Sequence, residues 1–334
     1  MILNYEHRQA GHCESGVTSN LLRNKGLNIS EPMILGIGSG IFFSHLPFFK
    51  LQFAPVTTFR TLPGFIFNRS TKALGIEIYK KTFKNPHDSM SALDRAIEQG
   101  HPVGLQVGIY NLPFFPPEYR MHYNLHNLVV YGKENGEYLV SDTVIPAPVK
   151  ISYNDLMKVR YPKGIFAPFG KMYYPLALPV QYDLHKAIVN GIRKASKDMI
   201  KIPFWMVGVK GIRFLAREML KWEKKFGEQK ANYYLGQVLR MEEEIGTGGA
   251  GFRFIYGAFL QEAAEILQNE KLSDISIEMG ETANRWRDFS FLGAKNCKKR
   301  GGVEVAYQEL AKILFEIADR EKKIFSTLLT MKLD

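Results

Sequence analysis

Cysteine is scarce in this sequence, whose 334 residues include only Cys13 and Cys297. Two cysteines cannot form the disulfide framework of a small secreted protein, and in a reducing compartment both are expected to be free thiols. No run of about 18 apolar residues is long enough to cross a bilayer, which argues against stable membrane insertion. The first residues, MILNYEHRQAGH, also lack the cationic start and apolar stretch of a secretory signal peptide. We therefore expect a cytoplasmic protein.

Acidic residues are outnumbered by basic ones: 33 Asp and Glu accompany 44 Lys and Arg, and the formal charge is +11. Such a charge often indicates nucleic-acid binding, but the sequence lacks zinc-finger spacing, an aromatic RNA-binding strand motif and a dense Lys/Arg recognition helix. We therefore predict no nucleic-acid partner. A basic surface attracts acidic partners over long range. Acyl carrier proteins are small and strongly acidic and fit this charge, as do a membrane surface and other acidic proteins, and a homo-oligomer remains open.

The hydrophobic pattern divides the chain near residue 170. Before this point, short apolar runs alternate with turns and a few short helices, which is typical of an α+β domain; the runs are VTTFRTLPGFIFN, HPVGLQVGIYNL, HNLVVYG and EYLVSDTV. After the stretch YPKGIFAPFGKMYYPLALP, nearly every segment has the i, i+3, i+4, i+7 spacing of a helix, as from Phe252 to Leu267 and from Tyr307 to Ala318. We predict an α+β domain over residues 1–170 and an all-helical domain over 180–334.

Cys13 lies at the start of a predicted helix in HRQAGHCESGVTSNLLRNKG. Val17 and Leu21 share one face of this helix, and Gly26 provides a stop signal. In the first turn, the backbone N–H groups and the positive end of the helix dipole favour a thiolate over a thiol. A buried structural cysteine fits the position as well, because placement without a base activates a thiol only weakly.

A candidate base lies downstream, in MHYNLHNLVVYGKENGEYLVSDTV, which reads as two strands joined by a tight turn. His126 begins the first strand and Asp142 lies near the end of the second. If the turn is centred on Glu134, antiparallel pairing makes His126 and Asp142 face each other to within one residue. An acidic side chain beside an imidazole fixes its tautomer and stabilises its charged form. Cys13, His126 and Asp142 therefore supply a nucleophile, a base and an orienting group.

The remaining cysteine and the histidines are candidates for a second reactive thiol and for a metal site. Cys297, in KNCKKRGG, sits among cations that lower the pKa of a thiol, but no base accompanies it, and we interpret it as a surface thiol. No metal is predicted, because CxxC and HExxH spacings are missing. The residues with ligand chemistry that could be assembled into a zinc site are His7, His12, His122, His126 and Cys13.

Two glycine-rich segments are candidate ligand sites. GIGSG at residues 36–40 lacks the third glycine of GxGxxG and the GK[ST] of a phosphate loop, so a chain turn is favoured over a nucleotide site. GTGGAGFRF at residues 246–254 opens a predicted helix, whose N-terminus favours anions, and Arg253 adds a positive charge for a pantetheine phosphate. Close packing of these glycines is the favoured interpretation.

The sequence resembles a known family over nearly its whole length. GHCESGVTSNLL, then GLNISEPMILGIGSGIFF, HNLVVYG and a strand ending in Asp resemble the N-terminal domain named after BtrH, an acyltransferase of butirosin biosynthesis. EEEIGTGGAGFRFIYGAFLQEAAEIL and the later ANRWRDFS resemble the helical domain of unassigned function that commonly follows it. The resemblance implies a papain-like α+β domain, related in arrangement to bacteriocin-processing peptidases, and an all-α C-terminal domain.

The resemblance also implies a reaction, in which a Cys takes an acyl group from a carrier-protein thioester and passes it to an amine or alcohol. Carried over to this chain, Cys13 is the nucleophile, His126 the base and Asp142 the orienting residue. The enzyme itself then needs no cofactor, because the donor protein carries the pantetheine. The acceptor would be a small molecule of specialised-metabolite or lipid biosynthesis.

The oxyanion site departs from the usual papain-like pattern. Such enzymes usually place a Gln six residues before the Cys, where this chain has His7, and Gln9 lies only four residues before Cys13. We expect the Cys13 backbone N–H together with Gln9 or His12 to bind the oxyanion. The segment YNLPFFPPEYRMHYNL, just before His126, offers aromatic bulk to cover a dry cleft, although an ordinary hydrophobic loop fits it as well.

Three functions remain open at this stage. The first is an acyltransferase with an acyl carrier protein as donor, and the second is a cysteine peptidase or amidase that uses the same residues with water as acceptor. The third is a non-catalytic binding protein on a papain-like fold, which would be favoured if Cys13 were buried without contact to His126. The resemblance and, more weakly, the basic charge favour the acyltransferase.

Overall fold

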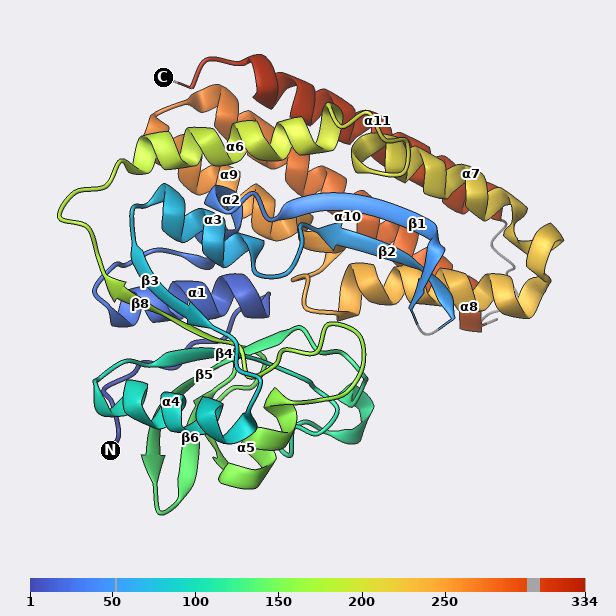
Figure 1. The fold of residues 1–334 in the computed structure, drawn as a ribbon. Coiled ribbons are helices and arrows are strands. Elements are labelled where there is room, and N and C mark those ends of the chain that lie inside the picture. Colours follow the sequence, from blue (N-terminus) through green and yellow to red (C-terminus); the bar gives the residue numbers. More distant parts are fainter. Residues whose placement is uncertain (52, 299–306, 334) are drawn as a thin grey trace. The chain divides into compact units, whose positions relative to one another are not determined.

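The protein is described by a computed structural model that covers residues 1–51, 53–298 and 307–333, apart from the side chain of Glu118. The chain forms two compact units (Figure 1). The first unit consists of Met1–Ile34 and Phe67–Asp183, and the second of Leu35–Ile66 and Leu184–Asp334. As predicted, the first unit is α+β and the second is mainly helical.

The first unit is built around a six-stranded antiparallel sheet (Figure 1). Its strand order is β3-β8-β4-β5-β6-β7, so the sequence-adjacent strands β4 to β7 form a meander that ends at one edge of the sheet. The strands are β3 (Glu77–Lys81), β4 (Val103–Val107), β5 (His126–Glu134), β6 (Glu137–Ser141), β7 (Val149–Ser152) and β8 (Met172–Ala177). Strand β8 shows that the sheet continues past residue 170, where the sequence pattern placed the end of the domain.

The hairpin of β5 and β6 closes through a two-residue turn at Asn135 and Gly136, whose φ angles are 50° and 84°. Two consecutive positive φ values are typical of the type I′ turn, and Asn-Gly is the dipeptide that adopts it most readily. The predicted centre at Glu134 is therefore wrong by more than one residue. A register shift between Val130 and Gly132 follows, and Val129 then pairs with Ser141.

Helices cover both faces of this sheet, because successive strand residues point to opposite sides. On one face, α1 (Cys13–Asn24) packs Val17 and Leu21 against Val129. On the other face, Leu128 and Val130 belong to a core shared with α4 (Pro86–Glu98) and α5 (Tyr153–Arg160). The remaining helices that begin in this part of the chain are α2 (Glu31–Ile37), α3 (Phe65–Ala73) and the 3-10 turn η1 (Pro117–Tyr119).

The second unit contains the long helices that the periodicity predicts (Figure 1). The periodic segments from Phe252 and from Tyr307 correspond to α9 and α11. The helices are α6 (Leu184–Ile200), α7 (Gly208–Phe226), α8 (Glu228–Leu239), α9 (Arg253–Leu267), α10 (Glu270–Lys298) and α11 (Tyr307–Thr330), with the π-helical turn η2 (Arg240–Glu244) and the 3-10 turn η3 (Ala250–Phe252) between α8 and α9.

A β-hairpin from the first half of the sequence belongs to this helical unit. It consists of β1 (Ile41–Leu51) and β2 (Ala54–Arg60), which the sequence division placed in the first domain. Phe43 and Phe59 each contact Trp286 of α10, at ring-centroid distances of 6.1 and 5.3 Å. The burial of these aromatic rings against α10 explains why residues 35–66 pack with a helix more than 200 positions downstream. The apolar run VTTFRTLPGFIFN is therefore divided between β2 and α3.

The GIGSG segment forms a chain turn after α2, as favoured from the sequence. The Ser39 N–H donates to the Gly36 carbonyl at 2.9 Å and the Gly40 N–H donates to the Leu35 carbonyl at 2.8 Å. A Cβ atom on Gly36 would lie 2.1 Å from the ring of Phe259 in α9. Close packing of backbone against an aromatic ring therefore requires glycine at position 36.

Candidate active site

Cys13 is the first residue of α1, as the sequence predicts, and a partly buried carboxylate fixes the start of this helix. Glu31 accepts hydrogen bonds from the backbone N–H groups of Gly11 at 2.9 Å and His12 at 2.7 Å, and from the Ser15 hydroxyl at 3.0 Å. Burial raises the pKa of Glu31, and these three hydrogen bonds oppose the rise. Because Glu31 holds the residues on both sides of Cys13, it fixes where the thiol lies.

His126 and Asp142 form a buried pair, with 2.6 Å between Nε2 of His126 and Oδ2 of Asp142. Oδ1 of Asp142 accepts a hydrogen bond from the Val144 N–H at 3.0 Å, so both carboxylate oxygens have partners. The pairing of Val129 with Ser141 would place Asp142 opposite residue 128, not opposite His126. Residues 126 and 128 lie on one face of β5, and the two side chains therefore meet diagonally across the hairpin.

Cys13 lies within hydrogen-bonding reach of His126 and helps to raise the pKa of its imidazole. Burial alone lowers the pKa of His126, but the charge and hydrogen bond of Asp142, followed by Cys13, outweigh this effect and raise the pKa to about 10. All three residues are nearly enclosed, with exposed fractions of 8% for Cys13, 3% for His126 and 0% for Asp142. The structure thus brings the three predicted residues together in an arrangement that favours an imidazolium beside the sulfur.

Asn127 is a fourth polar residue of this site, and sequence reasoning missed it. Its Nδ2 lies 3.6 Å from the Cys13 sulfur and donates to the Leu125 carbonyl at 3.2 Å. Its Oδ1 accepts a hydrogen bond from the Tyr173 hydroxyl at 2.8 Å, which fixes the orientation of the amide. Strand alternation places Asn127 on the opposite face of β5 from His126, and only the packing of α1 on that face brings the amide to the sulfur.

The structure places Gln9 and His7 elsewhere. The exposed Gln9 side chain donates to the Val144 carbonyl at 3.3 Å, and the His7 ring contacts the Ser141 hydroxyl at 2.7 Å and the Ile145 carbonyl at 3.0 Å. These contacts attach the N-terminal segment to the chain that follows β6. The amide found beside the sulfur is that of Asn127, so the expectation for Gln9 is not met.

His12 contributes to the start of α1. Its backbone N–H donates to Glu31, and its Nδ1 accepts a hydrogen bond from the Ser15 N–H at 3.2 Å, as a helix cap does. The described contacts therefore give His12 a role in positioning Cys13. Participation of the Cys13 backbone N–H in an oxyanion site stays a prediction.

Aromatic side chains cover one side of the imidazole. The buried Phe115 ring lies 5.5 Å from the His126 ring, centroid to centroid, and Tyr119 contacts Phe115 at 6.3 Å. Both residues belong to the β4–β5 connection, in the segment that the sequence suggested as a cover. Phe115 is part of the hydrophobic core of the unit, so this loop both packs and shields the site.

Arg253 does not have the predicted role in binding phosphate. It is fully buried in the second unit, and its Nε and Nη2 donate to the two carboxylate oxygens of Glu321 at 2.8 and 3.0 Å. Trp286 Nε1 also donates to Glu321, at 2.8 Å. A Cβ on the nearby Gly251 would lie 2.3 Å from the Phe59 ring, so the glycine-rich segment serves close packing. The guanidinium is committed to a structural ion pair.

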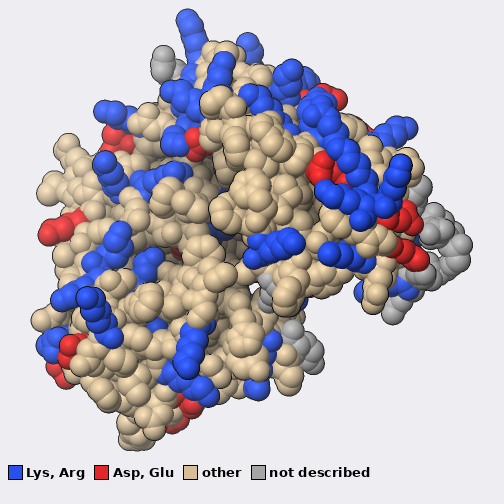
Figure 2. Space-filling model, turned by 45° about the vertical axis from the view of Figure 1, so that its right-hand side comes forward, with Lys and Arg blue, Asp and Glu red and all other residues tan. Residues whose placement is uncertain are grey.

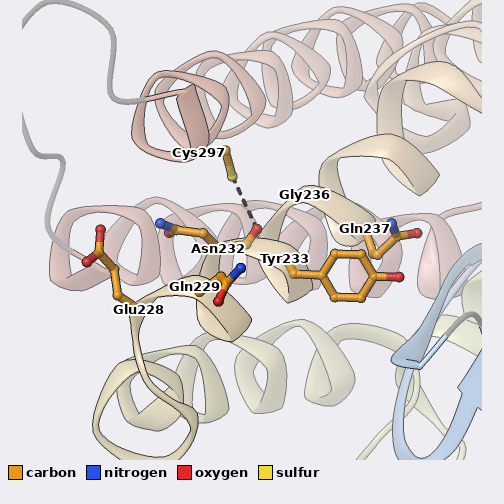
Figure 3. A pocket seen from close by; sticks show the side chains of 7 residues that line it. All are labelled: Glu228, Gln229, Asn232, Tyr233, Gly236, Gln237 and Cys297. Atoms are coloured by element: carbon orange, nitrogen blue, oxygen red, sulfur yellow. Dashed lines mark hydrogen bonds between the residues drawn. The ribbon is translucent and has the colours of Figure 1, made fainter.

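Cys297 lies in α10 at the edge of a pocket of about 590 Å³ (Figure 3). Its thiol donates to the Asn232 carbonyl at 3.4 Å. Burial raises the pKa of Cys297, and the nearby Lys298 opposes this only in part. The expectation of a lowered pKa is therefore wrong, and Cys297 is half-buried rather than a surface thiol. The residues lining this pocket include no histidine: they are Glu228, Gln229, Asn232, Tyr233, Gly236, Gln237 and Cys297.

The described ranges 1–51, 53–298 and 307–333 contain no group of three or more His, Cys, Asp or Glu side chains able to hold a metal ion. None of the helices in these ranges is both long and apolar enough to cross a bilayer. On the face shown in Figure 2, Lys and Arg side chains are spread widely over the surface.

Comparisons with known proteins agree with the resemblance seen in the sequence. The model for "Butirosin biosynthesis protein H, N-terminal" matches residues 12–143, and that for "Domain of unknown function (DUF4872)" matches residues 154–328. No curated protein matches the chain.

Among solved structures, a putative C39-like peptidase from Bacillus anthracis is similar, with 14% identity, a TM-score of 0.37, and coverage of 53% of this chain and 97% of that chain. This likeness is too distant to inform on chemistry. The cysteine at the start of a buried helix, beside His and Asp of an antiparallel sheet, has the arrangement of a papain-like cysteine enzyme. The second model spans more than half of the sequence, and the chain therefore belongs to the DUF4872 family, with a butirosin biosynthesis protein H type of N-terminal domain.

Proposed function

We propose that this protein is an acyltransferase, in which Cys13 takes an acyl group from a pantetheine thioester on an acyl carrier protein and passes it to a small amine or alcohol. The observation that carries the proposal is the enclosed group of Cys13, His126 and Asp142, with the Asn127 amide 3.6 Å from the sulfur. The condition that would have favoured a binding protein, a buried Cys13 without contact to His126, is not met.

In the first half of the reaction, the Cys13 thiolate attacks the carbonyl carbon of the donor thioester. A new carbon–sulfur bond forms, the bond to the pantetheine sulfur breaks, and the imidazolium of His126 gives its proton to the departing thiolate. Asp142 holds the imidazole through Nε2, which leaves Nδ1 as the ring nitrogen for this proton transfer. The Asn127 amide donates toward the sulfur at 3.6 Å, and we assign it to the oxyanion.

In the second half, the acceptor attacks the acyl-enzyme. Neutral His126 takes the proton from the amine or alcohol, the new carbon–nitrogen or carbon–oxygen bond forms, and Cys13 leaves as the thiolate beside a protonated imidazole. Water competes with the acceptor at this step. The near-complete burial of the three residues and the Phe115 ring over His126 support a site that excludes water, which a transferase needs more than a hydrolase does.

Charge supports an acidic donor protein. The chain has 44 Lys and Arg against 33 Asp and Glu, and an acyl carrier protein has the opposite charge. Attraction between exposed charges is screened over about 10 Å at 0.1 M salt. Binding of an acyl carrier protein should therefore weaken as salt is raised, and binding that is independent of salt would contradict this choice of donor.

The test is intact mass spectrometry after incubation with a panel of acyl carrier protein and acyl-pantetheine thioesters. The second cysteine offers a matched control, so the wild type, Cys13→Ala and Cys297→Ala are compared. We expect an acyl adduct on the wild type and on Cys297→Ala, none on Cys13→Ala, and the same circular dichroism spectrum for all three.

Each other outcome has a defined meaning. An adduct retained by Cys13→Ala would refute Cys13 as the nucleophile. An adduct that forms on Cys13 but decays at the same rate with and without added amines or alcohols would indicate a hydrolase. No adduct from any donor, combined with no labelling of Cys13 by iodoacetamide, would refute the proposed catalysis altogether.

A further inference from the structure

A second pocket, in the first unit, is lined in part by the loop that covers the imidazole of His126. It has a volume of about 480 Å³ and is formed by the β4–β5 connection and by α5. We call it the Arg120 pocket. Among the described side chains, its lining includes two cations and no carboxylate: the residues are Tyr110, Asn111, Leu112, Pro113, Pro117, Arg120 and Lys158.

The two cations of the Arg120 pocket are available to a ligand. Arg120 uses Nε to donate to the Phe115 carbonyl at 3.3 Å, which leaves the two terminal nitrogens of its guanidinium. Among the side chains that the structure describes, no carboxylate forms an ion pair with Arg120 or Lys158. A guanidinium with an ammonium and an amide beside it, in a pocket whose described lining holds no acidic side chain, is suited to a phosphate group.

The pocket is connected to the active site through Phe115. Arg120 holds the Phe115 carbonyl, and the Phe115 ring packs on His126 at 5.5 Å. The same loop is anchored at its start, where the Tyr110 ring stacks on His122 at 4.1 Å and the Ile109 N–H donates to the Tyr123 carbonyl at 3.0 Å. A ligand that orders Arg120 therefore also orders the aromatic cover of the imidazole.

We infer that the Arg120 pocket binds the phosphate of the acyl donor, through Arg120 and Lys158. The inference rests on the proposed function, in which the donor is a pantetheine thioester, and that arm is attached to its carrier through a phosphate ester. Arg120 and Lys158 take the phosphate-binding role that the sequence suggested for Arg253, whose guanidinium is buried against Glu321 and cannot reach a ligand. Recognition of the phosphate thereby places the donor against the loop that carries Phe115.

The test compares two donors that differ only in this group, acyl-phosphopantetheine and acyl-pantetheine with the same acyl chain. The measured quantity is the rate at which each acylates Cys13, followed by intact mass. Two charge-assisted contacts predict that the wild type reacts at least about 10-fold faster with the phosphorylated donor. We expect Lys158→Gln to reduce this ratio several-fold, and Arg120→Gln with Lys158→Gln together to bring it to about one.

The ratio of the two rates is the decisive readout. Because Arg120 also holds Phe115, its variant is expected to slow both donors, whereas only loss of phosphate recognition changes their ratio. Lys163→Gln is the matched control, since Lys163 is exposed and does not line the pocket, and it should leave both rates unchanged. A wild type without preference, or a preference that survives in the double variant, would overturn the inference.

Failure of the proposed function gives a different result, namely no adduct from either donor. Binding then decides the question: calorimetry with phosphopantetheine on Cys13→Ala should show binding that the two pocket substitutions abolish. Absence of binding, or binding unaffected by the substitutions, would overturn the inference on its own. Inorganic phosphate distinguishes the source of the group, since binding as tight as that of phosphopantetheine would identify free phosphate as the ligand and refute the donor.

Discussion

Replacing Asp142 by Asn tests the electrostatics of the site most directly. The side chain keeps its size but loses the charge that opposes desolvation of the imidazole. The pKa of His126 is raised from 6.5 to about 10 although burial alone lowers it, and Asp142 is the largest of the causes that raise it. At 1.36 kcal/mol per pKa unit, this rise corresponds to about 5 kcal/mol in favour of the imidazolium.

Without the Asp142 charge, burial brings the pKa of His126 to 6.5 or below, so at pH 7 the imidazolium changes from nearly the whole population to about a quarter or less. The assay is the rate at which iodoacetamide alkylates Cys13, measured by intact mass from pH 5 to 10 in a Cys297→Ala background that leaves a single thiol. We therefore expect Asp142→Asn to slow alkylation at least about 4-fold at pH 7 and to move the rise of the rate to higher pH.

The matched control is Asp94→Asn, the same chemical change at a carboxylate of the same unit that pairs with Lys133 and Tyr138 instead. This variant should be alkylated at the wild-type rate. Equal rates and equal pH profiles for the wild type and Asp142→Asn would refute the assigned role of Asp142. If Asp142→Asn does not fold, His126→Gln removes the same ion pair and is measured in its place.

The pKa of His126 also predicts how this pair contributes to stability. Because the pKa in the folded state lies above the value of 6.5 expected for an unfolded chain, the contribution is complete below pH 6.5. It is lost progressively as the pH rises to about 10. The difference in unfolding free energy between wild type and Asp142→Asn should therefore narrow over this range, as urea titrations would show.

Three further predictions concern stability and are measured by denaturant unfolding. Glu31→Ala removes the charged acceptor of the Gly11 and His12 N–H groups at the start of α1, and a loss of about 1–3 kcal/mol is expected; an unchanged midpoint would contradict this. Gly36→Ala places a Cβ 2.1 Å from the Phe259 ring and should cost about 1–3 kcal/mol, whereas Gly280→Ala, in α10, has open space around its Cβ and separates crowding from loss of glycine. Burial lowers the pKa of His45 to about 4, so stability should fall by up to about 3 kcal/mol as the pH drops from 6.5 to 4; His45→Gln should lack this fall.

Local signals in the sequence determined much of the fold. Apolar spacing predicted α9 and α11 because a helix repeats its buried face within a few residues. The segment that contains Asn-Gly predicted the β5–β6 hairpin, although the centre of its turn was misplaced. The three candidate catalytic residues could also be predicted from the sequence, because their chemistry is a property of residue type and two of them flank one hairpin.

Only the tertiary structure decided which distant segments pack together. Apolar character predicts that Phe43 and Phe59 are buried, but it does not specify Trp286 of the second unit as their neighbour. In the same way, Arg253 has the charge of a phosphate ligand, and its role is set by Glu321, 68 positions away. The Asn127 amide reaches the Cys13 sulfur because α1 covers one face of β5. Hydrophobic burial is non-directional and long-range pairing depends on the whole fold, so residue type determines the available chemistry and the tertiary structure decides where it is used.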